Sequence, residues 1–182
     1  VVINEAGQIC KPLVDRVKRR IQGPVSKDTI MNPLALARKL FIGDFMYFPA
    51  TAWKTETLKS AKWNLTYKNA VDLDLLFQLS LSSEQFVFQS AETFKYRRHS
   101  NSVSSVLAQE STRLKEELAA HWMATNLLPA KSGFLIRLLA NLAPTVRIHA
   151  MIIAVKQLPK SPVKGAKHFL RALGPLRPIK TH

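Results

Sequence analysis

Two carboxylates open the apolar segment at residues 71–81, "VDLDLLFQLSL". The spacing of its Val and Leu residues predicts a helix that begins near Asp72 and Asp74. A carboxylate within hydrogen-bond reach of a hydroxyl group can accept its proton while the oxygen attacks another atom. A carboxylate in a first helical turn can also serve only to favour the positive helix N-terminus. The residues alone leave both roles open for Asp72, whereas Asp74 lies on another side of the helix, where we expect it to be solvated or structural.

A basic polar cluster follows at the end of a strand-like segment. It contains Tyr96, Arg97, Arg98, His99 and Ser102. Guanidinium groups bind phosphate oxygens through paired hydrogen bonds and stabilise negative charge that develops as a phosphate leaves. The alternative is a surface strand end with ordinary basic residues. We expect Tyr96 and Ser102 to position the turn rather than to react.

The composition limits the class of protein. The 182 residues, 47% of them hydrophobic, are enough to bury one sizeable core. The net charge of +15 predicts an anionic partner, which can be nucleic acid, an anionic membrane surface or a phosphate-bearing substrate. The single cysteine, Cys10, excludes an internal disulfide framework and a thiolate zinc site, and it favours an intracellular chain.

The order of the predicted elements mixes helices and strands in the first hundred residues. We expect helices at 11–21, 32–40, 51–61 and 71–81, and strands at 41–51, 84–89 and 92–99. In the first helix, Leu13, Val14, Val17 and Ile21 form one apolar stripe, and the basic residues form the outer face. From Ser102 onward the composition is helical throughout.

The last third of the chain is basic. No Asp or Glu follows Glu117, and the segments "FLIRLLANL" and "KHFLRAL" pair apolar residues with cations. Such helices can lie in the interface of an anionic membrane, or they can pack as a bundle on the rest of the chain or on a partner. The apolar stretch 133–155 is interrupted by Arg137, Asn141, Pro144, Arg147 and His149, so we expect that it does not span a bilayer.

The sequence around the basic cluster resembles that of a known protein family. "YRRHSNSVS" resembles the YRxHxxSxS signature that closes the catalytic domain of many family 2 glycosyltransferases. The segment before it, "VDLDLLFQLSLSSEQFVF", is similar to the acidic-pair helix and following strands of that family. Further upstream, "FIGDFMYFPATAWKTETLKSAKWN" resembles the elements that precede the acidic pair. The resemblance covers residues 1–105.

The resemblance implies an α/β protein, the C-terminal half of a GT-A type domain followed by a basic all-helical tail. Residues 1–105 would be the acceptor-side part and residues 106–182 a helical extension. "VVINEAGQIC" has no signal-like start, and no D-x-D motif precedes Asp72, so we expect the nucleotide-binding half to lie upstream of this chain. By itself the chain is then expected to be inactive.

The implied activity is transfer of a sugar from a nucleotide-sugar to an acceptor hydroxyl, in the synthesis of cell-surface polysaccharide or glycolipid. The acceptor would be a carbohydrate or a lipid-linked molecule. The implied location is cytoplasmic, with peripheral contact at the inner face of the cell membrane through the basic helices.

The resemblance also assigns roles to particular residues. Asp72 matches the catalytic acid of the family's pair, although Val71 stands where the first acid is usual. Arg97, Arg98 and His99 would bind the donor diphosphate. His99 could also complete a site for Mg²⁺ or Mn²⁺ together with a D-x-D motif that this chain lacks. Trp53 and Trp63 could stack on a sugar face, and the alternative for each is a place in the core.

Two other classes of protein remain open. The chain could be a non-catalytic remnant or regulatory homologue of the transferase, because the donor half is missing. It could also be a basic nucleic-acid-binding module, although it has no recognised helix-turn-helix, zinc-finger or RNA-binding aromatic signature.

Overall fold

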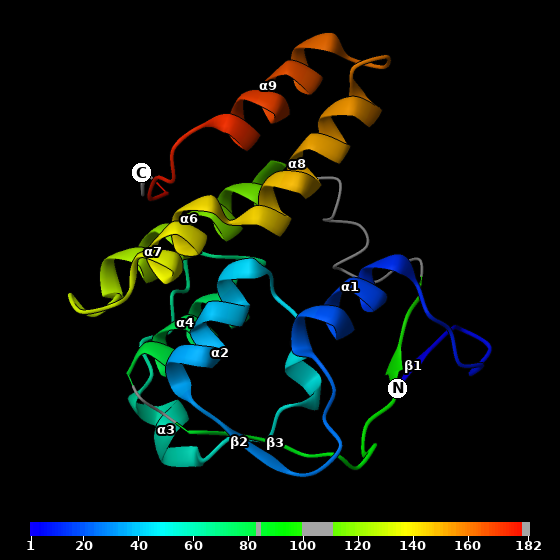
Figure 1. The fold of residues 1–182 in the computed structure, drawn as a ribbon. Coiled ribbons are helices and arrows are strands. Elements are labelled where there is room, and N and C mark those ends of the chain that lie inside the picture. The colour runs from blue at the N-terminus through cyan, green and yellow to red at the C-terminus, as the bar shows by residue number, and fades with distance from the viewer. Residues whose placement is uncertain (83–84, 100–110, 180–182) are drawn as a thin grey trace.

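The computed structural model describes residues 1–82, 85–99 and 111–179. They form short strands and many helices, shown in Figure 1. The strands are β1 (Val2–Ile3), β2 (Thr29–Met31), β3 (Phe86–Phe88) and β4 (Tyr96–Arg97). The helices are α1 (Leu13–Gln22), α2 (Pro33–Ile42), the 3-10 helix η1 (Phe48–Ala50), α3 (Thr55–Ser60), α4 (Val71–Leu81), α6 (Ser111–Leu127), α7 (Phe134–Leu142), α8 (Pro144–Gln157) and α9 (Pro162–Leu173).

The helices predicted before residue 82 are confirmed as α1, α2, α3 and α4, but the strand predicted at 41–51 is wrong. The α2 helix continues to Ile42, and the chain then forms η1. Asn32 fixes the start of α2, because its side-chain oxygen accepts the backbone N–H groups of Leu34 and Ala35. The buried face of α2 includes Leu40 and Phe41, so helical packing continues into the aromatic residues that favour a strand by composition.

The strands form two small sheets, and one of them positions the basic cluster. β1 pairs with β4 in parallel, with Val2 opposite Tyr96 and Ile3 opposite Arg97. β2 pairs with β3 in antiparallel fashion. The strand predictions at 84–89 and 92–99 are confirmed over shorter spans, as β3 and β4. The parallel pair fixes Arg97 and Arg98 beside the first residues of the chain.

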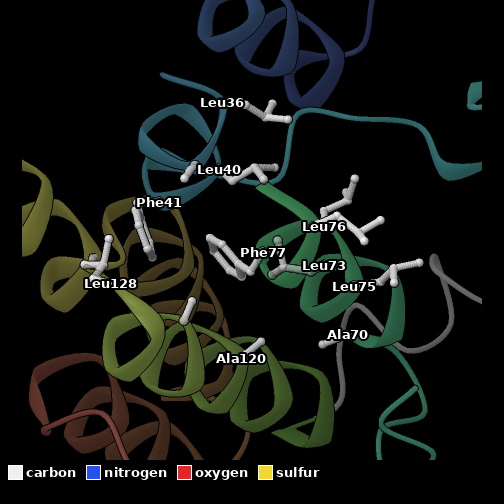
Figure 2. Close-up of a cluster of buried hydrophobic side chains, with 14 of the residues drawn as sticks. Leu36, Leu40, Phe41, Ala70, Leu73, Leu75, Leu76, Phe77, Ala120 and Leu128 are labelled. Atoms are coloured by element: carbon white, nitrogen blue, oxygen red, sulfur yellow. The ribbon is translucent and has the colours of Figure 1, made fainter. Parts of the chain in front are cut away.

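The main core joins α2, α4, α6 and α7. Phe41 of α2 stacks on Phe77 of α4 with ring centroids 4.8 Å apart, and Figure 2 shows these two rings between the helices. His121 of α6 completes the group, with its ring centroid 5.1 Å from that of Phe77. The buried cluster also includes Leu128, which directly follows α6, and Ile136 of α7. This core therefore contains residues from both sides of the predicted boundary at residue 105.

A helical hairpin of α8 and α9 carries a second core. Val146, Ala150 and Ile153 of α8 pack with Ala172 of α9 and with two leucines of α6. Figure 1 shows this hairpin at the opposite end of the molecule from β2 and β3. Gly165 allows the close approach of the two helices, because a Cβ atom there would lie 2.8 Å from the side chain of Leu158.

Within the described residues, one helical stretch, Phe134–Gln157, is long and apolar enough to cross a membrane by length and composition alone. It comprises α7 and α8, which are separated by Ala143 with a left-handed φ of 41°. Arg147 of α8 donates to the carbonyl oxygens of Ala172 and Gly174, at 2.6 and 2.8 Å. Those contacts tie this stretch to the end of α9.

Candidate active site

Asp72 lies half-buried in the first turn of α4. Its Oδ1 accepts the backbone N–H of Leu73 at 2.9 Å. Burial and the nearby Asp44 carboxylate raise the pKa of Asp72 to about 6, while the Leu73 N–H and Lys18 act in the opposite direction. Asp72 therefore remains ionised near neutral pH and is a stronger base than a solvent-exposed aspartate.

Asp44 follows α2 and is held in place by Lys18 of α1. Lys18 Nζ donates to Asp44 Oδ2 at 3.1 Å and to the carbonyl oxygen of Met46 at 2.9 Å. The backbone N–H of Met46 donates to Asp44 Oδ1 at 3.2 Å. These contacts fix a second carboxylate within electrostatic range of Asp72.

Gly43 brings the first turn of α8 against this loop. A Cβ atom on Gly43 would lie 2.4 Å from Thr145 Oγ1 and 2.8 Å from Thr145 Cγ2. The backbone at Gly43 is extended, so the requirement for glycine comes from this close approach and not from its conformation. The tail helix α8 thus contacts the loop that carries Asp44.

Arg113 of α6 supplies a further positive charge near the two acids. Its Nε donates to Glu117 Oε1 at 2.8 Å. Burial lowers the pKa of Arg113, but Glu117, Asp44 and Asp72 together raise it above its usual value. The acids around Asp72 are therefore balanced by cations from α1 and α6.

Arg98 forms a two-point ion pair with Asp15 of α1. Arg98 Nε and Nη2 donate to the two carboxylate oxygens of Asp15, each at 2.7 Å. Tyr47 also donates its hydroxyl hydrogen to Asp15 Oδ1. Burial raises the pKa of Asp15, but the hydrogen bonds from Arg98 and Tyr47 and the positive charges of Arg98 and Lys18 lower it overall. Arg98 is thus engaged in fixing the basic cluster to α1.

Lys18 connects the two polar groups that stand apart in the sequence. Its Nζ lies 4.9 Å from the ring centroid of Tyr47, and its charge lowers the pKa of both Asp15 and Asp72. The partner of Arg98 and the acid of α4 therefore share one cation. The structure brings the basic cluster and Asp72 into one electrostatic network.

Helix α1 is oriented differently from what its apolar stripe predicts. Asp15 is buried, whereas Leu13 and Val17 of the predicted apolar stripe are exposed. The basic outer face is confirmed at Arg16. Most of the apolar stripe also lies on the outside, whereas Ile21 at the end of α1 is partly buried against the main core. The ion pairs of Asp15 and Lys18 occupy the inner face instead.

Arg97 and His99, the other two cationic residues of the cluster, have exposed side chains. Arg97 Nη1 donates to the backbone carbonyl oxygens of Glu5 and Asn4, at 2.7 and 3.3 Å. His99 is exposed at the end of the described segment. Ser102 lies outside the described residues. The diphosphate-binding role of Arg97, Arg98 and His99 stays a prediction.

Asp74 is buried and has a structural role. Its Oδ2 accepts a hydrogen bond of 2.7 Å from Gln78, and the same amide nitrogen of Gln78 donates to the carbonyl oxygen of Lys62 at 3.0 Å. Burial raises the pKa of Asp74, with the hydrogen bond from Gln78 acting against it. The expectation of a solvated side chain is wrong, and the structural alternative is confirmed.

The two tryptophans differ in their surroundings. Trp53 packs against the main core, with ring centroids 5.8 Å from Phe48 and 6.2 Å from Phe86. Trp63 is 40% exposed, and its indole N–H donates to the carbonyl oxygen of Leu58 at 3.3 Å. Trp53 therefore has the position in the core that was the alternative to sugar stacking. Of the two tryptophans, only Trp63 has a ring exposed enough to contact a ligand.

The described residues do not by themselves form a site for the implied divalent metal. No group of three or more His, Cys, Asp or Glu side chains among them converges on a point where an ion could bind. His99 therefore remains a single candidate ligand, and this chain by itself does not provide a coordination shell.

The sequence analysis missed most of the partners of Asp72 and Arg98. These are Asp15, Lys18, Asp44, Tyr47 and Arg113. Each of these residues lies in a different segment of the chain from Asp72 or Arg98. A spacing pattern within one segment therefore cannot predict the contact. The one signal present was an acid on α1 within an otherwise basic helix, which favours a buried ion pair.

Comparisons of the chain with protein-family models, with curated proteins and with solved structures found no match. The resemblance to family 2 glycosyltransferases rests on the residues of this chain alone. The activity that it implies is accordingly a proposal.

Proposed function

We propose that this chain is the acceptor-side part of a nucleotide-sugar-dependent glycosyltransferase, with Asp72 as the general base. The observation that carries the proposal is the environment of Asp72. Burial and Asp44 raise its pKa to about 6 at the start of α4. A general base works best when its pKa lies close to the working pH while it is still ionised.

The proposed reaction forms one bond, breaks one bond and transfers one proton. The acceptor hydroxyl oxygen attacks the anomeric carbon of the donor sugar and forms the new glycosidic bond. The bond from that carbon to the phosphate oxygen breaks, and its electron pair leaves with the nucleoside diphosphate. Asp72 takes the proton of the acceptor hydroxyl. The reaction is balanced without any further reagent.

The network around Asp72 supports this assignment in two ways. Lys18 and Arg113 keep the carboxylate ionised at neutral pH, because each stabilises its negative charge. Asp44 acts in the opposite direction and makes the proton easier to accept. Together with burial, these charges give Asp72 a pKa of about 6, slightly below neutral pH.

The basic cluster would act on the leaving diphosphate, in roles that differ between its members. Arg98 is a positioning residue, because its paired hydrogen bonds to Asp15 fix β4 against α1. Arg97 and His99, whose side chains are exposed, are the members that would contact phosphate oxygens. No step is assigned to a metal, since the described residues do not form a site for one.

The test uses protein expressed from the gene with whatever coding sequence lies upstream of Val1. Release of nucleoside diphosphate is measured with a panel of nucleotide-sugars and acceptor glycans. Asp72→Asn keeps the shape of the side chain but cannot take a proton, so we expect kcat to fall by roughly 10²- to 10⁴-fold. Donor affinity should survive in this variant.

Asp28→Asn is the matched control, because Asp28 accepts hydrogen bonds from Ser90 at an exposed site distant in sequence from the acids of α4. It should retain full turnover. In the wild type, kcat/KM should decrease as the pH falls below about 6, the pKa of Asp72. Near-normal turnover of Asp72→Asn would contradict the role of Asp72 as the general base. A folded wild-type protein that turns over no nucleotide-sugar would favour the non-catalytic alternative.

A further inference from the structure

The surface of α9 is divided lengthwise into three faces. Gly165, His168 and Ala172 form the buried face, which packs on α8. Lys164, Lys167 and Arg171 form a basic face on one side of it. The remaining face is apolar and consists of Val163, Ala166, Phe169, Leu170 and Leu173.

The apolar face of α9 is exposed to solvent. Val163 is 79% exposed, Leu170 is 70% exposed and Leu173 is 61% exposed. These side chains recur at the spacing of one helical stripe, so they form a continuous patch along α9. The described chain buries the opposite side of the helix and leaves this patch without a cover.

The charges around this patch all have one sign. Lys164 and Lys167 lie on the basic face, and Lys156 and Lys160 stand at the end of α8 and in the turn before α9. The sequence has no acid after Glu117 to neutralise them. The hairpin therefore combines an exposed apolar face with a positive field.

We infer that α9 lies in the plane of an anionic phospholipid surface, with Leu170 and Leu173 among the acyl chains and Lys164 and Lys167 at the phosphate groups. A helix with an apolar face and a lysine-rich polar face binds in this way. The negative potential of such a surface complements the acid-free hairpin. The long lysine side chains can reach the headgroups while their methylene groups cover apolar surface.

A protein partner fits the same face less well. Lysine is depleted in protein interfaces relative to the rest of the surface, since its charge is costly to desolvate. At a lipid headgroup the same charge remains hydrated and meets a phosphate. The inference does not depend on the proposed transferase activity, because it rests on α8 and α9 alone.

The experiment measures cosedimentation of the chain with vesicles of phosphatidylcholine alone and with vesicles containing phosphatidylglycerol, at low and at high salt. We expect tighter binding to the anionic vesicles, and a difference that shrinks as salt is added. The apolar variant is Leu170→Ser with Leu173→Ser, and the charge variant is Lys164→Gln with Lys167→Gln. All four positions are exposed, so both variants should fold, which far-UV circular dichroism and urea unfolding check.

The two variants should fail in different ways. The apolar variant should lose binding at both salt concentrations. The charge variant should bind anionic vesicles roughly 30-fold more weakly and neutral vesicles as before. Leu65→Ser is the matched control, because Leu65 is 86% exposed in the segment before α4 and should not contact lipid.

Three outcomes would overturn the inference. Equal binding to both kinds of vesicle at low salt would remove the role of charge. Binding to random duplex DNA that the charge variant weakens and the apolar variant leaves unchanged, without vesicle binding, would point to nucleic acid instead. Self-association in the absence of vesicles that the apolar variant abolishes would mean that a second copy of the chain covers this face.

Discussion

Glu116 and Asn69 are separated by 47 positions in the chain, and Glu116 Oε2 accepts the backbone N–H of Asn69 at 2.6 Å. The same oxygen accepts the N–H groups of Lys68 and Ala70, at 3.0 and 3.2 Å. These donors lie directly before α4, whose N-cap residue, Ala70, has no side chain able to accept them. A carboxylate from α6 therefore fixes the start of the helix that carries Asp72.

Glu116→Ala should destabilise the fold. The substitution leaves the buried N–H groups before α4 without their acceptor, and we expect the free energy of unfolding to fall by about 2 to 4 kcal/mol. Glu116→Gln retains an acceptor oxygen but loses the charge, and it should cost about 1 kcal/mol. Urea unfolding measures both. Lys115→Ala, an exposed neighbour on α6, should stay within about 0.5 kcal/mol of the wild type.

Asp44→Asn should lower the pKa of Asp72. Burial and Asp44 together raise that pKa to about 6, so removing the Asp44 charge should bring it back toward its usual value of 3.8. Carboxyl carbon NMR titration of the 182-residue chain measures the shift, and Asp28→Asn is the control that should leave it unchanged. An Asp72 pKa that stays near 6 in Asp44→Asn would mean that burial acts alone.

His121 should make the fold sensitive to mild acid. Burial lowers its pKa from 6.5 to about 4, and the positive charge of Arg147 acts in the same direction. Between these two values the unfolded chain binds a proton that the folded chain does not, so the free energy of unfolding falls as the pH falls. The loss contributed by this residue is complete below about pH 4 and amounts to about 3 kcal/mol.

His121→Phe should remove that contribution, because an aromatic ring still packs against Phe41 and Phe77. The measurement compares urea unfolding of the wild type and this variant at pH 7 and pH 4.5. Asp72, with its raised pKa, acts in the opposite direction in part of this range, but it is present in both proteins and cancels from the difference. Identical pH dependence in the two proteins would contradict the prediction.

Gly43→Ala should disturb the contact between the Asp44 loop and α8. The new Cβ atom would lie 2.4 Å from Thr145 Oγ1, so one of the two segments must move. We expect a loss of about 1 to 3 kcal/mol in urea unfolding. Adding Thr145→Ala removes the two nearest atoms and should restore part of the loss, and additive effects of the two substitutions would argue against the clash.

The sequence by itself determined the local elements where the apolar residues follow a clear helical or strand spacing. The apolar spacing of 71–81 predicts α4 with Asp72 in its first turn, and the alternation at 84–89 predicts β3. The strand predicted at 41–51 failed because the aromatic composition of that segment favours a strand, while Phe41 is buried on the helical face of α2. Tertiary packing thus overrode a local preference.

For the candidate site, the sequence by itself identified Asp72 and the basic cluster, since an acid at a helix start and adjacent arginines are visible in a short window. Only the tertiary structure decided that Arg98 pairs with Asp15, that Lys18 binds Asp44 and that most of the apolar stripe of α1 faces outward. The physical reason is that burial makes an unpaired charge far more costly than an exposed Leu or Val. Which face of α1 is buried is therefore set by partners 26 and 83 positions away, at Asp44 and Arg98, which no local pattern records.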